Sequence, residues 1–130
     1  MKLLIHIAFI SNLFAQITEI SNLEIGKRGD YYRVWVYFDE RDQKNTIDLD
    51  PKSIRRREKH DIYGMTKYDY IIKPSYLNIL KKTGVEIKNK SRWLNAVSVI
   101  ADKDQLLIIK KLPFVIKIEP VRQHKKKKEI

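Results

Sequence analysis

The segment from Tyr31 to Phe38 alternates strictly between two sets of side chains, and this alternation constrains the fold more strongly than any other feature. The first set is Tyr32, Val34, Val36 and Phe38, and the second is Tyr31, Arg33, Trp35 and Tyr37. A repeat of two residues is that of a pleated β-strand, whose successive side chains point to opposite faces. We therefore predict a strand with one buried face and with Trp35 and Tyr37 on its outward side.

Two later segments carry helix signals. The first begins at Pro74, a favoured first helical residue, and stops at Gly84, a residue that often ends a helix. The second follows Asp102, whose partner Gln105 lies three residues on as in a capping box, and it ends at Pro113. Apolar residues recur at helical spacing in both: Tyr76, Leu77, Ile79 and Leu80 in the first helix, and Leu106, Leu107, Ile109 and Leu112 in the second.

Three more strands are predicted around these helices. They cover Val85–Lys88, Arg92–Ile100 and Phe114–Val121, with a turn at Asn89–Ser91 between the first two. The resulting order is strand, helix, strand, strand, helix, strand. This order is typical of the ferredoxin-like plait. We expect an α+β fold, a ferredoxin-like βαββαβ plait whose four-stranded antiparallel sheet carries two helices on one face.

The bare face of that sheet is a candidate interaction surface. The predicted third strand is apolar on both alternations, with Trp93 and Leu94 near its start, and the first strand adds Trp35 and Tyr37. Large exposed apolar patches mark interaction sites. The alternative is that the long polar connection, residues 39–72, or a second copy of the chain covers this face.

The domain organisation follows from the same pattern. We expect a signal peptide at residues 1–15, an N-terminal extension at 16–30, one domain at 31–121 and a basic C-terminal tail at 122–130. The domain contains the long connection 39–72, for which helical character is predicted around Lys52–Lys59 after Pro51. Connections of this length are usually functional or partly disordered.

The N-terminus resembles a secretory signal. Lys2 precedes an apolar run from Leu3 to Ile10, and Ala15 offers a small residue for cleavage. The run is shorter than the ~20 residues that span a membrane. The alternative to a signal peptide is a buried N-terminal strand or helix. We expect an exported protein, secreted or held in the periplasm or at the cell surface, with no membrane contact after signal removal.

The charge and the missing cysteines limit the chemistry. The formal net charge of +11 favours nucleic acid or an anionic membrane as partner, but the charge is concentrated around Arg55–Lys59 and Arg122–Lys128, as in solvated faces or tails. The chain has no cysteine, and its three histidines lie far apart, so we expect no disulfide, metal site or cofactor.

Several segments resemble a known family. They are Ser53–Arg57, Gly84–Lys88, Ser91–Val99 and Leu112–Val121, together with the opening strand. Their sequence and spacing resemble the N-terminal pro-region (propeptide inhibitor domain) of subtilisin-like serine proteases of the exported bacterial type. The resemblance covers roughly residues 31 to 122, and Ser-Arg-Trp-Leu-Asn-Ala-Val followed by Leu-Pro-Phe-Val is its most specific part.

The resemblance implies a folding helper and inhibitor. In this family the open sheet face packs against two surface helices of the protease catalytic domain, in cis or in trans, and the C-terminal extension lies in the substrate cleft like a product. The docking residues implied here are Arg33, Trp35, Tyr37, Trp93 and Glu119, with Glu119 facing a helix N-terminus of the protease. The cleft-binding tail would comprise Val121, Arg122, Gln123, His124 and Lys125.

The chain itself is not expected to be an enzyme. It contains no Asp-Thr-Gly, His-Gly-Thr or Gly-Thr-Ser motif, so the serine protease triad has no candidates. Whether it is a truncated precursor or a stand-alone inhibitor of the same fold stays open. An RNA-recognition module shares the element order and stacks bases on aromatic residues, but its signature on the third strand is missing. We therefore do not expect nucleic acid as a partner.

Overall fold

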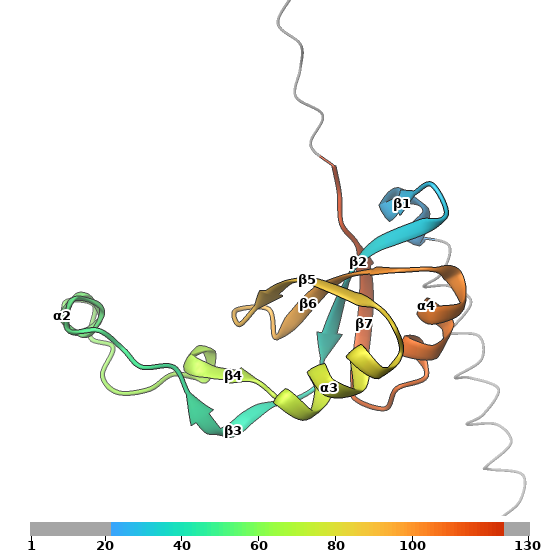
Figure 1. Cartoon of the computed structure of the whole chain (residues 1–130). Coiled ribbons are helices and arrows are strands. Elements are labelled where there is room, and N and C mark those ends of the chain that lie inside the picture. The colour runs from blue at the N-terminus through green and yellow to red at the C-terminus, as the bar shows by residue number, and fades with distance from the viewer. Residues whose placement is uncertain (1–21, 124–130) are drawn as a thin grey trace, which may run out of the picture.

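The structure, a computed structural model, describes residues 22–123 and is an α+β fold. It divides into a body and an arm that extends away from it (Figure 1). The body contains η1 (Asn22–Gly26), β1 (Lys27–Arg28), β2 (Tyr31–Phe38), α3 (Pro74–Lys82), β5 (Glu86–Ser91), β6 (Ala96–Ala101), α4 (Lys103–Lys110) and β7 (Val115–Pro120). The arm, residues 39–72, contains β3 (Arg41–Thr46), α2 (Pro51–Glu58), η2 (Lys67–Asp69) and β4 (Tyr70–Ile72).

The main sheet is built around β2, which pairs antiparallel with β6 on one side and with β7 on the other. Strand β5 pairs with β6, and the short β1 pairs with the start of β2. The sheet therefore has five strands, and the expected count of four is wrong. The additional strand is β1, which has two residues and forms a hairpin with β2 through the turn at Gly29, whose φ is +62°. Two residues are too few to show an alternation in sequence.

The predicted strand Tyr31–Phe38 is confirmed with its alternation, because Val34, Val36 and Phe38 are buried. Helices α3 and α4 lie on the same side of the sheet (Figure 1) and contribute Leu80 and Ile109 to the core. Helix α3 begins at Pro74 as predicted.

The capping box at the start of α4 is also confirmed. The backbone N–H of Gln105 donates to the Asp102 carboxylate over 2.8 Å, and the backbone N–H of Asp102 donates to the Gln105 side chain over 2.9 Å. Two N–H groups that the first turn leaves without helical partners are therefore satisfied.

The predicted boundary between β5 and β6 is wrong. The turn does not lie at Asn89–Ser91, which belongs to β5; the chain turns at residues 92–95, and β6 begins at Ala96. Asn95 sets this position because it adopts a left-handed conformation with φ of +50°, which asparagine tolerates better than most residues. Its backbone carbonyl also accepts a hydrogen bond from the N–H of Phe38 over 2.9 Å.

The connection 39–72 is more structured than its sequence suggested. The predicted helical character after Pro51 is confirmed as α2, but the antiparallel pair β3–β4 and the 3-10 helix η2 were not predicted. Strand β3, Arg-Asp-Gln-Lys-Asn-Thr, has no apolar alternation that could have revealed it. Helix α2 lies at the far end of the arm (Figure 1).

Part of the predicted N-terminal extension, residues 22–30, belongs to the body. Leu23 is buried in the core. Gly26 lies so close to β2 that an added Cβ would come within 2.5 Å of the carbonyl oxygen of Arg33. The predicted signal peptide, residues 1–15, lies outside the described residues. Among residues 22–123, no helix is long and apolar enough to cross a membrane.

Candidate docking surface

The face of the sheet opposite α3 and α4 carries the predicted docking residues of β2. Arg33, Trp35 and Tyr37 alternate with the buried Val34 and Val36, and all three are half-buried. Directly opposite residues of antiparallel strands lie on the same face. Trp35 is opposite Ser98 of β6 and Glu119 of β7, and Tyr37 is opposite Ala96 and Lys117. The structure therefore brings four predicted docking residues, Arg33, Trp35, Tyr37 and Glu119, onto one surface, called here the open face.

A polar cluster fixes Tyr37 on this face. Its hydroxyl donates to Glu119 Oε2 over 2.8 Å, while the Lys117 ammonium pairs with the same carboxylate and lies 5.5 Å from the centre of the Tyr37 ring. Burial and the neighbouring carboxylate raise the pKa of Tyr37 to about 12. Lys117, and then Tyr37, lower the pKa of Glu119. At neutral pH the phenol is therefore protonated and the carboxylate is charged.

The Glu119 carboxylate keeps room for an external donor. Its side chain is 38% exposed, although Tyr37 and Lys117 both contact it. A carboxylate offers about four acceptor sites, so these two contacts leave some of them for a partner. Its position at the edge of the open face suits an approaching group with unpaired N–H donors.

Strand β6 contributes smaller side chains to the open face than the sequence suggested. Its positions on this face are Ala96, Ser98 and Ile100, of which Ala96 and Ser98 are fully buried. The Ser98 hydroxyl accepts a hydrogen bond from the N–H of Asn89 over 3.1 Å, so it is satisfied within the sheet. Strand β6 therefore adds little exposed surface to this face.

The fifth predicted docking residue, Trp93, does not lie on the third strand. It is part of the turn before β6, where it is 62% exposed and its ring lies 5.1 Å from that of Tyr68 of the arm. Its docking role stays a prediction, but its neighbours are those of the arm and not those of Trp35.

The predicted cleft-binding tail begins where β7 ends. The N–H of Val121 donates to the carbonyl of Arg33 over 2.9 Å, and the Arg28 guanidinium reaches the carbonyl of Val121 at 3.3 Å. The chain therefore leaves the sheet beside Arg33, at one end of the open face. Arg122 and Gln123 follow without strand structure, whereas His124 and Lys125 lie outside the described residues.

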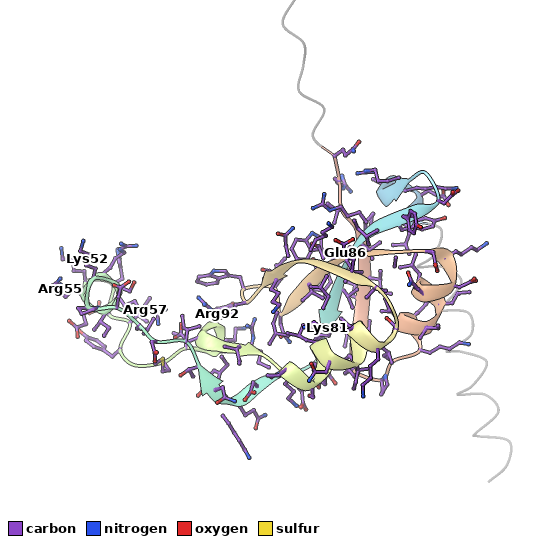
Figure 2. The ribbon with its side chains drawn as sticks, viewed as in Figure 1. Lys52, Arg55, Arg57, Lys81, Glu86 and Arg92 are labelled. Atoms are coloured by element: carbon purple, nitrogen blue, oxygen red, sulfur yellow. The ribbon has the colours of Figure 1, made fainter. Side chains whose placement is uncertain are left out.

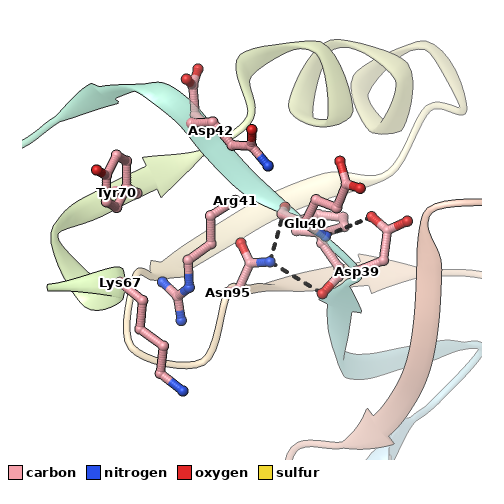
Figure 3. A pocket seen from close by; sticks show the side chains of 9 residues that line it. Asp39, Glu40, Arg41, Asp42, Lys67, Tyr70 and Asn95 are labelled. Atoms are coloured by element: carbon pink, nitrogen blue, oxygen red, sulfur yellow. Dashed lines mark hydrogen bonds between the residues drawn. The ribbon is translucent and has the colours of Figure 1, made fainter.

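A joint at the other end of the open face connects the arm to the body, and sequence reasoning missed most of it (Figure 3). The Asn95 amide donates to the carbonyls of Phe38 and Glu40 over 3.1 and 3.0 Å. The Arg41 guanidinium donates to the carbonyls of Arg92 and Trp93, which belong to the same turn as Asn95. A cavity of about 640 Å³ opens here, lined by Phe38, Asp39, Glu40, Arg41, Asp42, Gln43, Lys67, Tyr70 and Asn95.

A second feature that the sequence did not indicate stabilises the arm. The Arg57 guanidinium donates to both oxygens of Asp69, each over 2.7 Å, and Asp69 is fully buried. Asp69 also accepts from the backbone N–H of Thr66 over 2.7 Å. These contacts, the Arg57 guanidinium foremost, hold the pKa of Asp69 far below its usual range. Arg57 and Asp69 are twelve positions apart, and no helical or strand periodicity in the sequence between them predicts their contact.

Within residues 22–123 no group of three or more metal-ligating side chains occurs. The family model described as "Peptidase S8 propeptide domain, Bacteroidota" matches residues 33–130, which include most of β2, the arm, the joint and the predicted tail. No curated protein and no solved structure matches the chain. The match covers most of the sequence and agrees with the predicted resemblance, so this chain belongs to the peptidase S8 propeptide domain family of Bacteroidota.

Proposed function

We propose that this chain acts as folding helper and product-like inhibitor of a peptidase S8 catalytic domain, which it contacts through the open face. The proposal includes a signal peptide at residues 1–15, export of the precursor, and a docking domain at 31–121 of the ferredoxin-like plait type. Membership of a propeptide family supports association with a peptidase S8 domain. The observation that carries the docking role is the clustering of Trp35, Tyr37 and Glu119 on the face that α3 and α4 leave bare.

The physical basis of the helper role is differential binding. A large parallel α/β domain has many non-local contacts and forms slowly. A small preformed sheet that binds the native catalytic domain more tightly than the unfolded chain stabilises the native state by mass action. Because the same docking would bring the tail to the substrate cleft, folding assistance and inhibition would be a single interaction.

Three of the docking residues, Trp35, Tyr37 and Glu119, have distinct proposed roles. Trp35 and Tyr37 supply the apolar contact, and the bond from Tyr37 to Glu119 holds both side chains in place before docking. The Glu119 carboxylate accepts hydrogen bonds from the unpaired N–H groups of a protease helix N-terminus, where negative charge is favourable. Residues 121–125 then extend into the cleft, at ~3.3 Å per residue.

The test compares two double variants of the purified chain. Trp35→Ser with Tyr37→Ser removes the apolar contact, while Leu107→Ser with Ile108→Ser, on the exposed side of α4, is the control. Each is measured as an inhibitor of a Bacteroidota peptidase S8 catalytic domain and as a helper in its refolding. We expect the open-face variant to lose at least tenfold in affinity and the control to change less than twofold.

Two outcomes would overturn the proposal. One is an unchanged inhibition constant of the open-face variant in a chain that still inhibits. The other is RNA binding that survives high salt and depends on Trp35, because affinity from the lysines alone rests on counterion release and falls as salt rises. The thermal midpoint of both variants is recorded, since a large decrease would show that Trp35 and Tyr37 belong to the core.

A further inference from the structure

The far end of the arm carries a cationic stripe. Lys52, Arg55, Arg56 and Lys59 follow the spacing i, i+3, i+4 and i+7, which places them on one face of a helix. All four are exposed, and none lies within ion-pair distance of a carboxylate of the described residues, although Arg56 adds, after the N–H of Ser53, to the lowering of the pKa of Asp50. Lys52 and Arg55 point outward from this end of the arm (Figure 2). Their charge is therefore available to a partner.

An apolar hollow lies next to this stripe. The cavity measures about 320 Å³ and is lined by Asp48, Leu49, Ile54, Arg57, Glu58, Ile62, Tyr63, Gly64 and Met65. Several of these apolar side chains face solvent, with Tyr63 71% and Met65 49% exposed. Exposed apolar residues around a concavity, next to unpaired charge, are typical of a protein interaction site.

The tip of the arm, residues 48–69, is held in shape although it adds nothing to the core of the body. Helix α2 has no buried residue. Its N-terminus is capped by Asp50, which accepts from the N–H of Ser53 over 2.7 Å, and Arg57 joins it to the buried Asp69. Ordering a backbone costs about 1–2 kcal/mol per residue, and here that cost is offset mainly by polar contacts, together with the ring contact of Tyr68 with Trp93. This construction favours a role for the tip outside the body.

The chemistry of the tip favours a protein surface over a lipid surface. The apolar side chains line a hollow, which accepts a protruding side chain better than it inserts into a bilayer. Acidic side chains at Asp48, Asp50, Glu58 and Asp61 lie among the basic ones and would be repelled by anionic lipid. The arm is also joined to the body beside the open face, through Asn95, so a large partner on that face extends toward the arm.

We propose that the tip of the arm is a second docking element, which binds an acidic surface of the same catalytic domain that the open face contacts. This inference rests on the proposed function. The cationic stripe of the tip supplies long-range attraction, which accelerates association of oppositely charged surfaces. The hollow beside α2 receives one apolar side chain of the partner.

The test uses charge reversal with a closely matched control. Arg55→Glu with Arg56→Glu reverses two charges in the last turn of α2, and Lys81→Glu with Lys82→Glu does the same in the last turn of α3. Binding of the full chain to a Bacteroidota peptidase S8 catalytic domain, with its nucleophilic serine replaced by alanine, is measured from 50 to 500 mM salt. At the lowest salt we expect about tenfold weaker binding for the arm variant, mostly from slower association, and less than twofold for the control.

The milder variant Arg55→Gln with Arg56→Gln guards against misfolding, because it removes charge without opposing the helix dipole. We expect about threefold weaker binding from it and an unchanged far-ultraviolet circular dichroism spectrum. Equal binding of wild type, arm variants and control would overturn the arm inference alone. Absence of any binding by the wild type would overturn the proposed function as well. Binding to phosphatidylglycerol vesicles that depends on Arg55 and Arg56, with the protein complex unaffected, would assign the tip to a membrane and overturn the inference.

Discussion

The body and the arm are ordered by different physical means. The body buries apolar side chains from β2, β6, α3 and α4 in one cluster. In the arm, residues 39–72, only Asp69 and Ile72 are buried, and the tip depends on the bidentate contact between Arg57 and Asp69. The body is therefore expected to unfold as one cooperative unit, whereas the arm can open locally at a lower free energy.

The two means of ordering suit the two proposed docking roles. A hydrophobic core gives the open face a stable shape before any partner binds. A tip held mainly by polar contacts can instead place charge and apolar side chains in solvent without disturbing that core. The predictions below test whether the two regions are independent, beginning with the largest expected effect.

Loss of core packing should destabilise the whole body. Leu80 of α3 is fully buried, so Leu80→Ala should lower the free energy of unfolding by about 2–5 kcal/mol. Leu107→Ala, at an exposed position of α4, should cost less than about 1 kcal/mol. Urea denaturation measures both. A similar loss for the two variants would show that the core is not where the structure places it.

Asn95 connects the two regions, so its replacement should affect both. Asn95→Ala removes two hydrogen bonds and leaves alanine at a φ of +50°. We expect the free energy of unfolding to fall by about 2–4 kcal/mol, which is the sum of the lost hydrogen bonds and the strain of the left-handed conformation. Asn95→Gly should lose about 1 kcal/mol less, because glycine adopts this conformation freely. If alanine and glycine are equally destabilising, the backbone conformation of Asn95 contributes little.

The Arg57–Asp69 pair should matter to the arm alone. Asp69→Asn retains the size of the side chain but removes its charge, and we expect the arm to open more easily by about 1–3 kcal/mol. Hydrogen exchange of the arm amides measures this change. The urea midpoint of the body should move little. If Asp69→Asn lowers the free energy of unfolding of the whole chain as much as Leu80→Ala does, the arm and the body form one cooperative unit.

Acid should weaken the arm in the same way, but only once the pH falls below about 4. The folded-state pKa of Asp69 lies below its unfolded value, so the stabilisation is complete above the unfolded pKa of about 3.9 and is lost as the pH falls below it. The free energy of arm opening, obtained from exchange rates corrected for the pH dependence of exchange in an unfolded chain, should therefore not depend on this residue from pH 7 to 5 and should decrease below about pH 4. Asp69→Asn should abolish this acid dependence, and its persistence would contradict the assignment.

The body was largely predictable, because its signals are periodic or local. The alternation from Tyr31 to Phe38 reflects burial of one sheet face, and the capping box of Asp102 and Gln105 spans one helical turn. The sequence predicts the turn before β6 at Asn89–Ser91 because these residues are as polar as those of most turns, but they belong to β5. The true position depends on bonds from Asn95 to residues more than fifty positions earlier.

The candidate site was predictable only in part, for a similar reason. The outward positions Trp35 and Tyr37 follow from the strand, but their grouping with Glu119 required the pairing of β2 with β7. Trp93 was expected on a strand, and the arm contacts that hold it at the turn leave no trace in sequence. The contact between Arg57 and Asp69 depends on how the arm folds, and the arm sequence has no apolar pattern from which that fold could be predicted.

The base of the arm has an evolutionary consequence. Arg41 and Ile72 are paired partners of β3 and β4, so the chain enters and leaves the arm at neighbouring points. Residues between them can be added or removed without moving either end, and each doubling of a loop costs only about 0.6 kcal/mol in closure entropy. Selection can therefore lengthen, shorten or recharge this segment to follow changes in a partner, while the register of β2 and the rest of the sheet stays as it is.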